Sequence, residues 1–386
     1  MDFFYSDLQR EIRASVRALC DTFGPDYWRQ CDAERRYPEE FVRAMSAAGW
    51  LGILIPEEYG GGGQGITEAS IVLEEINHSG GSSAVCHAQM YTMGALLRHG
   101  SEEQKRRYLP GIASGALRLQ AFGVTEPDAG SDTTRIKTFA RKTASGYLIN
   151  GQKVFTSRYQ HSDLMVLLAR TTPIEDARKK TDGLSLFLVD TRAAGDSIQA
   201  KPIDMLINHE TNQLFINDLE APQDALIGDE GRGFSYLLDG LNAERILIAS
   251  ECVGDGHWFI EQATAYAGQR TVFDRPIGKN QGVQFPIAKA HMSVEAADLM
   301  RLKAAAAFDA HQPCGAEANM AKYLASEASW EAADVAMATL GGYGLANEYH
   351  VERKWRETRL YRTAPITNGM ILSFVAEHVL RMPRSY

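Results

Sequence analysis

The strongest constraint in this sequence is a hydrophobic period that changes twice along the chain. In roughly the first 115 residues, apolar side chains recur at steps of three and four, as in amphipathic helices. Between residues 119 and 219, short runs rich in β-branched and aromatic residues take over, separated by clusters of Gly, Asp, Pro and Lys. Helical spacing returns at Gly233 and continues almost to residue 386. The sequence therefore predicts an α+β multidomain protein, with a helical segment (1–118), a β-segment (119–230) and a second helical segment (231–386).

The N-terminal helices are located by their apolar stripes and end signals. Pro38 suits a first helical position and Gly49 follows the last apolar-periodic residues, which predicts a helix between them. Ser101 and Gln104 have the spacing of a capping box at the start of a further helix. Other helical patterns cover residues 67–77 and 85–99, and the stripe of the first helix consists of Phe4, Leu8, Ile12, Val16 and Leu19.

Composition and charge exclude several classes of protein. Apolar residues make up 45% of the 386 residues and charged residues 23%, as in a globular protein with a large core. Lys and Arg total 40 against 49 for Asp and Glu, a net charge of −9, and no basic run follows a phosphate backbone, so no nucleic acid partner is expected. The five cysteines are far apart and form no CxxC pair, which favours reduced core thiols.

Targeting and metal motifs are not found in the sequence. The first residues, MDFFYSDLQREIR, contain acids where a signal peptide has a basic region, and no apolar stretch approaches the length of a membrane span. We therefore expect a cytoplasmic protein without a membrane partner. Neither HExxH nor GxSxG occurs, so no metal site and no nucleophile elbow is expected.

Three polar segments are candidates for ligand binding. Residues 122–132, FGVTEPDAGSD, offer backbone N–H groups and hydroxyls to a phosphate or polar heterocycle, or form an ordinary turn. Phe155, Thr156 and Ser157 place an aromatic ring beside two hydroxyls after a predicted strand, which suits either a flat cofactor or strand core. The charged segment 270–281 is compatible with an anionic ligand or with a solvated turn.

Glu244 is the strongest candidate for a catalytic acid or base. Leu237, Leu241, Glu244 and Ile248 follow steps of four, three and four, so this carboxyl is expected on the interior face of a helix. Burial raises the pKa of a carboxyl toward neutrality, where it becomes a useful general base. A structural ion pair with a buried Arg or Lys explains the same pattern equally well.

At four of these places the chain resembles the acyl-CoA dehydrogenase family. The matching segments are VTEPDAGSD (124–132), INGQKVFTS (149–157), RTVFDRPIGKNQ (270–281) and GGYGLANEYHVER (341–353), in the family's order and spacing. The resemblance covers nearly the whole length and implies an N-terminal α-helical domain, a central β-barrel domain and a C-terminal four-helix bundle. It also implies FAD as cofactor and a homotetramer.

The resemblance transfers site roles residue by residue. It places Phe155 against the flavin ring and Ser157 at the flavin N5 edge, and it lets Arg270, Phe273 and Gln281 reach the FAD of a neighbouring subunit. The full set implied for FAD is Phe122, Val124, Thr125, Gly130, Ser131, Phe155, Ser157, Arg270, Phe273, Gln281, Gly341, Gly342 and Thr367. The set implied for the thioester substrate is Ser131, Arg245, Tyr91 and Leu241.

The chain departs from the common pattern at the catalytic base. Most members carry the base in a YEGT motif near the C-terminus, and gap-free alignment puts Pro365 there, which also lacks the backbone N–H of that position. A minority, similar to isovaleryl and long-chain dehydrogenases and carrier-protein-linked prolyl oxidases, place the Glu on the helix after the β-domain. The matching residue is Glu244.

The resemblance implies α,β-dehydrogenation of an acyl thioester, as in fatty acid metabolism. Glu244 would take the α-proton while the β-hydrogen leaves as hydride to flavin N5. The thioester is an acyl-CoA or an acyl carrier protein, and the electrons go to an electron-transfer flavoprotein or to oxygen. A flavin oxidase or monooxygenase on the same scaffold, and an acyl-thioester binding protein with weak turnover, are the alternatives.

Overall fold

The computed structural model describes residues 5–384, so Phe4 of the first predicted stripe lies outside the described residues. The chain forms two compact units. The first unit comprises the described residues up to Phe41, Gly65–His87 and those from Asn242 on, and the second comprises Val42–Gln64 and Ala88–Leu241.

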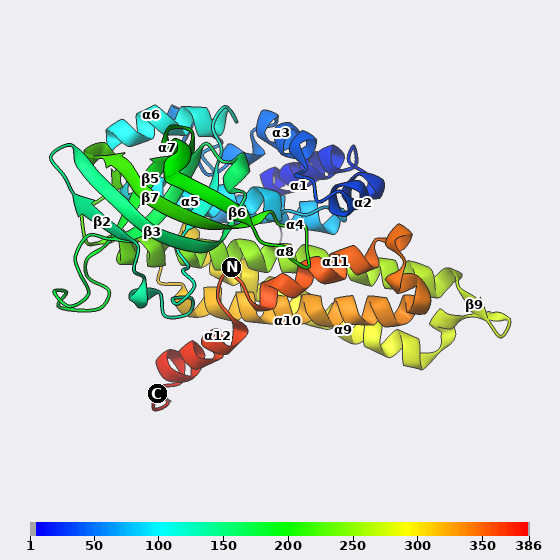
Figure 1. Ribbon diagram of the computed structural model, residues 1–386. Coiled ribbons are helices and arrows are strands. Elements are labelled where there is room, and N and C mark those ends of the chain that lie inside the picture. Colours follow the sequence, from blue (N-terminus) through cyan, green and yellow to red (C-terminus); the bar gives the residue numbers. More distant parts are fainter. Residues whose placement is uncertain (1–4, 385–386) are drawn as a thin grey trace. The chain divides into compact units, whose positions relative to one another are not determined.

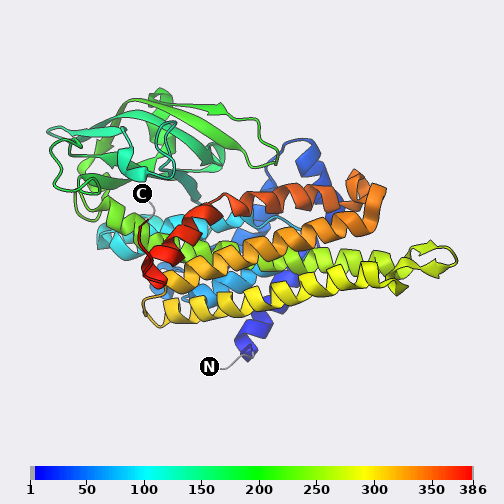
Figure 2. The same cartoon turned by 90° about the horizontal axis from the view of Figure 1, so that it is seen from below.

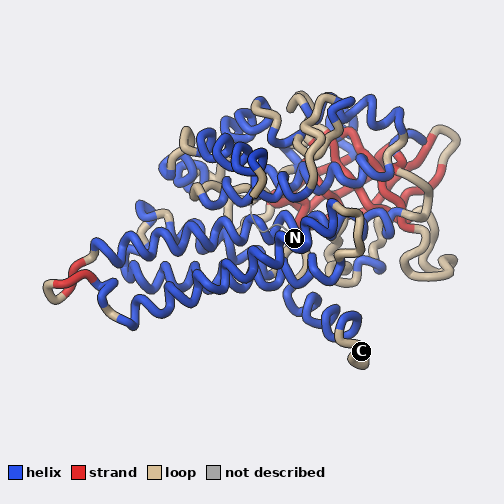
Figure 3. The backbone as a smooth tube through the Cα atoms, turned by 180° about the vertical axis from the view of Figure 1, so that it is seen from behind, coloured by secondary structure: helices blue, strands red, loops and turns tan. Residues whose placement is uncertain are grey.

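The first unit is built from helices (Figure 1). Beyond residue 242, helix α8 runs beside α9, α10 and the shorter α11, and α12 follows (Figure 2). A two-stranded hairpin joins α8 to α9 and forms the tip of these long helices (Figure 3). The elements are α1 (Asp7–Cys20), α2 (Pro25–Ala33), α4 (Ile66–His78), α8 (Gly233–Gln269), β9 (Thr271–Val272), β10 (Arg275–Pro276), α9 (Gln281–Asp309), α10 (Gly315–Leu340), α11 (Val351–Thr358) and α12 (Asn368–Phe374). The expected C-terminal helical domain is confirmed.

Helix α1 packs on α4 through the predicted stripe and through charges. Ser6 and Gln9 form a capping box at its start, and Ile12 and Val16 are buried. Leu8 is exposed, so the buried part of the stripe is shorter than predicted. Arg13 forms an ion pair at 2.9 Å with Glu74 of α4.

Helix α4 is held by residues far along the chain. The Asp309 carboxylate, at the end of α9, accepts hydrogen bonds from the backbone N–H groups of Ile66 (2.7 Å) and Thr67 (3.0 Å), which lack partners inside the helix. The fully buried Arg301 of α9 donates to Glu74 at 2.9 Å. The C-terminal helices therefore complete both the start and the middle of α4.

The second unit combines helices with one large sheet. Helix α3 begins in the first unit and ends before Gly49, whose φ of 82° stops the helix as predicted. Ser101 and Gln104 form the predicted capping box of α6. The elements are α3 (Glu39–Ala47), α5 (Ala84–His99), α6 (Glu102–Ala113), β1 (Leu119–Gly123), β2 (Phe139–Lys142), β3 (Gly146–Ser157), β4 (Leu164–Arg170), β5 (Leu184–Asp190), α7 (Thr191–Ala194), β6 (Ile198–Pro202), β7 (Thr211–Pro222) and β8 (Leu226–Ile227).

The sheet is open. Its strand order is β6-β7-β3-β2-β4-β5-β8, and β1 pairs parallel to β4 outside that path. Within residues 5–384 the end strands β6 and β8 do not pair with each other, so the closed barrel implied by the family resemblance is not formed. The β-character of the segment was predicted correctly, but closure depends on pairing between distant edges that local patterns do not encode.

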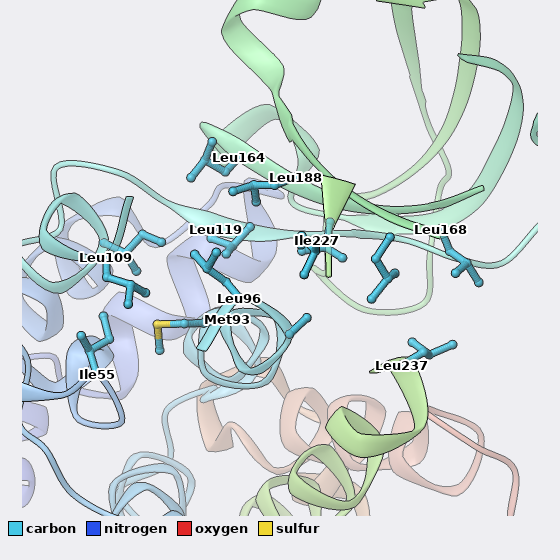
Figure 4. Packing of buried hydrophobic residues seen from close by; sticks show 14 of the residues in the cluster. Ile55, Met93, Leu96, Leu109, Leu119, Leu164, Leu168, Leu188, Ile227 and Leu237 are labelled. Atoms are coloured by element: carbon cyan, nitrogen blue, oxygen red, sulfur yellow. The ribbon is translucent and has the colours of Figure 1, made fainter. Parts of the chain in front are cut away.

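Apolar residues of α5, α6 and the strands form the core of the second unit (Figure 4). Met93 and Leu96 of α5 pack with Leu119 of β1 and Leu164 of β4, all at most 2% exposed. Phe122 near the end of β1 and Val124 in the loop that follows also pack against this core, which positions the start of the polar loop. Among the described helices, none combines the length and apolar character needed to cross a membrane.

Candidate active site

Glu244 is buried on α8, as its spacing predicted. Glu244 is only 5% exposed, and its Oε2 has no hydrogen-bond partner among the described residues. Burial raises the pKa of Glu244 to about 8, the positive charge of Arg245 opposes this, and the nearby carboxylate of Glu251 adds to it. Once ionised, a carboxyl with this pKa is a stronger base than an ordinary carboxylate, and its Oε2 is free to accept a proton.

Arg245 follows Glu244 and is also buried. One Nη donates to Asn242 Oδ1 at 3.0 Å, whereas Nε has no partner within residues 5–384. Burial lowers the pKa of Arg245, and the neighbouring Glu244 carboxylate opposes that effect. The pair is therefore a buried acid beside a buried cation, each with one polar atom left for a ligand.

Two further acids lie on the Glu244 face of α8. Glu251 and Asp255 follow it by seven and eleven residues, steps that return to the same helical face, and both are fully buried. His87 Nδ1 lies 2.9 Å from Glu251 Oε1, and Lys354 Nζ lies 2.5 Å from Asp255 Oδ1. The sequence analysis did not predict this row of acids, although the steps of seven and four residues between them are typical of one helical face.

The segment around Pro365 is fixed by a buried lysine. Lys322 of α10 donates to the Ile366 carbonyl and to Asn368 Oδ1, both at 2.8 Å. Burial lowers the pKa of Lys322 to about 8. The hydroxyl of Thr367 accepts a hydrogen bond from Met370 N and thereby caps α12. Pro365 is half-buried beside these residues, and no carboxyl takes its place in the sequence.

In the second unit, the loop after β1 is tied to β3. Val154 N donates to Thr125 O at 2.9 Å, and the buried Lys153 donates to Val124 O at 3.0 Å and to Glu126 Oε1 at 2.9 Å. These bonds hold residues 124–126 of the loop next to residues 153 and 154, which lie near the end of β3.

The ends of these segments carry an exposed ring and hydroxyls. Phe155 is 59% exposed and adopts a φ of 59°, while the buried Thr156 Oγ1 has no partner in the described part of the chain. Ser157 Oγ lies 3.2 Å from the Thr211 hydroxyl. Phe122 stacks edge-on against Tyr91 of α5, with ring centroids 5.6 Å apart. This arrangement fits a flat, hydrogen-bonding ligand.

The remaining predicted residues are mostly exposed, and most of them lie outside that loop. Phe273 is 94% exposed at the turn of the β9–β10 hairpin, and Arg270 and Gln281, which flank the hairpin, are also exposed. Gly341 and Gly342 begin a short exposed turn after α10. Gly130 and Ser131 are exposed in the loop after β1, and Leu241 is half-buried on α8.

Comparison with known proteins identifies the family. Residues 6–116, 121–219 and 231–380 match the models of the N-terminal, middle and C-terminal domains of acyl-CoA dehydrogenases. Acyl-CoA dehydrogenase FadE12 of Mycobacterium tuberculosis is 38% identical over 387 residues, which cover 100% of this chain and 99% of that protein. The chain belongs to the acyl-CoA dehydrogenase family.

Solved structures agree with this family membership. A glutaryl-coenzyme A dehydrogenase in complex with glutaryl-CoA is similar with a TM-score of 0.93 and 32% identity, covering 100% of this chain and 98% of that one. PigA with FAD and proline is similar with a TM-score of 0.91 and 25% identity, covering 98% and 99%. The family and the FAD-containing neighbour indicate FAD as the cofactor of this acyl-CoA dehydrogenase homologue, and the exposed ring and hydroxyls at the end of β3 fit such a group.

Proposed function

We propose that this flavoprotein dehydrogenates an acyl thioester at its α and β carbons and that Glu244 is the base. The observation that carries the assignment is the buried carboxyl whose Oε2 has no hydrogen-bond partner among the described residues and whose pKa is raised to about 8. The family resemblance aligns Glu244 with the position where a minority of members carry the catalytic Glu, and it aligns Pro365 with the position used by the majority.

The chemistry divides between the protein and its cofactor. FAD, when bound, accepts the β-hydrogen with its electron pair. Glu244 removes the α-proton, and the adjacent Arg245 favours the ionised form of the carboxylate before that step. Because burial holds the proton on Glu244 below about pH 8, the base is active only in the fraction of molecules that have lost it.

The cofactor roles remain proposals that rest on the family resemblance and on local geometry. The hydrogen bonds from Lys153 and Val154 hold Val124 and Thr125 next to the strand end that bears Phe155 and Ser157. We therefore assign the flavin ring to Phe155 and its polar edge to Ser157. The residues proposed to complete the FAD site are Phe122, Gly130, Ser131, Gly341, Gly342 and Thr367, and those proposed to contact the thioester are Tyr91, Ser131, Leu241 and Arg245.

A homotetramer is proposed with Arg270, Phe273 and Gln281 reaching the FAD of a neighbouring subunit. Phe273 exposes 94% of its surface at the hairpin turn. Helix α9 also presents Phe285, Met292 and Leu299, each seven residues from the next and each more than half exposed. An apolar stripe of this kind on a long helix favours contact with a second copy. The cytoplasmic location stays a prediction from the sequence.

Anaerobic titration of the FAD-loaded protein with acyl thioesters tests the proposal. A dehydrogenase bleaches its flavin with a matching thioester, and reoxidation by an electron-transfer flavoprotein or by air then identifies the acceptor. A monooxygenase requires an external reductant before any bleaching occurs. Absence of bleaching with every CoA and carrier-protein thioester, while those thioesters bind, would leave the binding-protein alternative.

A further inference from the structure

Glu251 is a fully buried acid that the proposed reaction does not use. It lies on the same face of α8 as Glu244 and seven residues further on, which is about 10.5 Å along the helix axis at 1.5 Å per residue. The other two acids on this face are already explained. Glu244 is the proposed base, and Asp255 forms an ion pair with Lys354.

The contacts of Glu251 come from α4 and from the start of α5. His87 Nδ1 lies 2.9 Å from Oε1. Asn77 of α4 donates to the Glu251 backbone carbonyl at 3.0 Å and accepts a hydrogen bond from Ser83 N at 2.8 Å, so it places Ser83 beside this part of α8. Asn77 also donates to the hydroxyl of the buried Tyr361 at 3.2 Å, which fixes the amide.

Two buried polar atoms of this group have neither a hydrogen bond nor an ion-pair contact among the described residues. They are Glu251 Oε2 and Ser83 Oγ, and both residues are 0% exposed. The atoms Glu251 Oε1 and His87 Nδ1 lack a well-aligned hydrogen bond but lie 2.9 Å from each other. A carboxylate oxygen and a hydroxyl left unsatisfied in the interior each cost free energy that a hydrogen-bonding ligand would recover. A hydroxyl is the smallest group that donates to a carboxylate and accepts from a serine at the same time.

We propose that Glu251 and Ser83 bind a hydroxyl group carried on the acyl chain of the substrate. The proposal rests on the proposed function, because it takes the reacting C2 carbon to lie at Glu244. The two carboxyls are about 10.5 Å apart along the helix axis, which sets the upper limit for the distance from C2 to the hydroxyl. Subtracting about 3 Å of contact at each end gives a lower limit of about 4.5 Å. An extended chain advances about 1.2 Å per bond, so the hydroxyl is separated from C2 by about four to nine bonds.

Binding of CoA thioethers, which have no acyl carbonyl and are not oxidised, tests this subsite. Isothermal titration of the FAD-loaded protein would compare terminal methyl, hydroxyl and ammonium groups on alkyl chains of about five to ten carbons. At the best length we expect the hydroxyl form to bind at least about tenfold more tightly than its methyl counterpart, since two buried groups gain partners. Equal affinities at every length would overturn the proposal, and tighter binding of the ammonium form would overturn the choice of a hydroxyl.

Substitutions assign the preference to the named side chains. Glu251→Leu should reverse the affinity preference in favour of the methyl thioether, and Ser83→Ala should reduce the preference for the hydroxyl form. Glu261→Gln, an exposed acid further along α8, is the matched control and should leave it unchanged. If Glu251→Leu fails to fold, Glu251→Gln keeps the shape and should still reduce the hydroxyl preference; an unchanged preference in a folded variant would contradict the assignment.

These affinities do not depend on catalysis. A wild type that shows the hydroxyl preference but never reduces its flavin would refute the proposed reaction and leave the subsite standing. A wild type that reduces its flavin with apolar thioesters and shows no hydroxyl preference would refute the subsite alone.

Discussion

Replacing Glu244 by glutamine separates the chemistry of this residue from the cost of burying it. Glutamine keeps the shape of the side chain but cannot accept the α-proton. We therefore expect thioester binding to survive and flavin reduction to fall by about 10²–10⁴, the range for loss of a general base. The same substitution removes a carboxyl whose pKa is about 8 instead of the ordinary 4.5.

That pKa predicts the effect on stability and its sign. A difference of about 3.5, at about 1.36 kcal/mol for each pKa unit, corresponds to about 5 kcal/mol between ionised and protonated Glu244. Because the folded-state pKa is raised, the folded protein holds this proton more tightly than the unfolded chain, and the free energy of unfolding falls as pH rises from about 4.5 to about 8. Glu244→Gln should therefore melt well above wild type at about pH 9 and close to it at about pH 4.5.

Both effects can be measured on one preparation of the FAD-loaded enzyme. Stopped-flow absorbance under anaerobic conditions gives the rate of flavin reduction at saturating thioester, and thermal melting at the two pH values gives the stability difference. Glu261→Gln removes an exposed acid of the same helix that pairs with His78 at 2.8 Å. It should leave the rate of flavin reduction unchanged, and its effect on melting gives the size expected for loss of a partly exposed ion pair.

One result would refute the reasoning. If Glu244→Gln reduced its flavin at the normal rate and melted below wild type at high pH, Glu244 would be the structural partner of Arg245. Removing one member of a buried ion pair strands the other charge and costs about 3–5 kcal/mol.

Three further predictions concern ionisation, assembly and folding. In wild type, flavin reduction should accelerate as pH rises through about 8, because only ionised Glu244 accepts a proton, and a rate that falls over that range would argue against this base. Arg270→Ala should lower FAD content and the size of the assembly together, measured by absorbance and light scattering, since a ligand bound across an interface stabilises it by linkage; loss of FAD with the assembly intact would place Arg270 in its own subunit's site. Asp309→Ala should lower the free energy of unfolding by about 1–2 kcal/mol in urea, because two N–H groups of α4 lose their acceptor, and an unchanged midpoint would mean that water replaces it without cost.

Features with a strong local pattern could be predicted from the sequence. The capping box at Ser101 and the end of α3 at Gly49 need only neighbouring residues, and the burial of Glu244 followed from a helical period sustained over several turns. Helix α2 escaped prediction because only Trp28 and Cys31 of its nine residues are buried, too few to establish a period.

Features that depend on distant partners could not be predicted. Strand β6 has one buried residue, Ile198, and takes its conformation from pairing with β7, so its own sequence carries little strand signal. The contact between His87 and Glu251 joins residues on different helices. Patterns within one helix place each of them on a face but do not show which side chains meet across that face. The cofactor and substrate roles came from family resemblance, because loop composition alone left an ordinary turn equally plausible.

The contacts of α4 with later residues cannot form on the ribosome until those residues have been synthesised. The bonds from Ile66 to Asp309, from Arg301 to Glu74 and from Arg353 to the Gly80 carbonyl span 243, 227 and 273 residues. At about 5–20 residues per second, the wait between synthesis of Ile66 and of Asp309 is about 12–49 s. During that interval α4 lacks the acceptor for the N–H groups of Ile66 and Thr67, and Glu74 lacks its bond from Arg301. Chains that stop within the β-segment are therefore left with an unfinished N-terminal helix that chaperones or proteases can recognise.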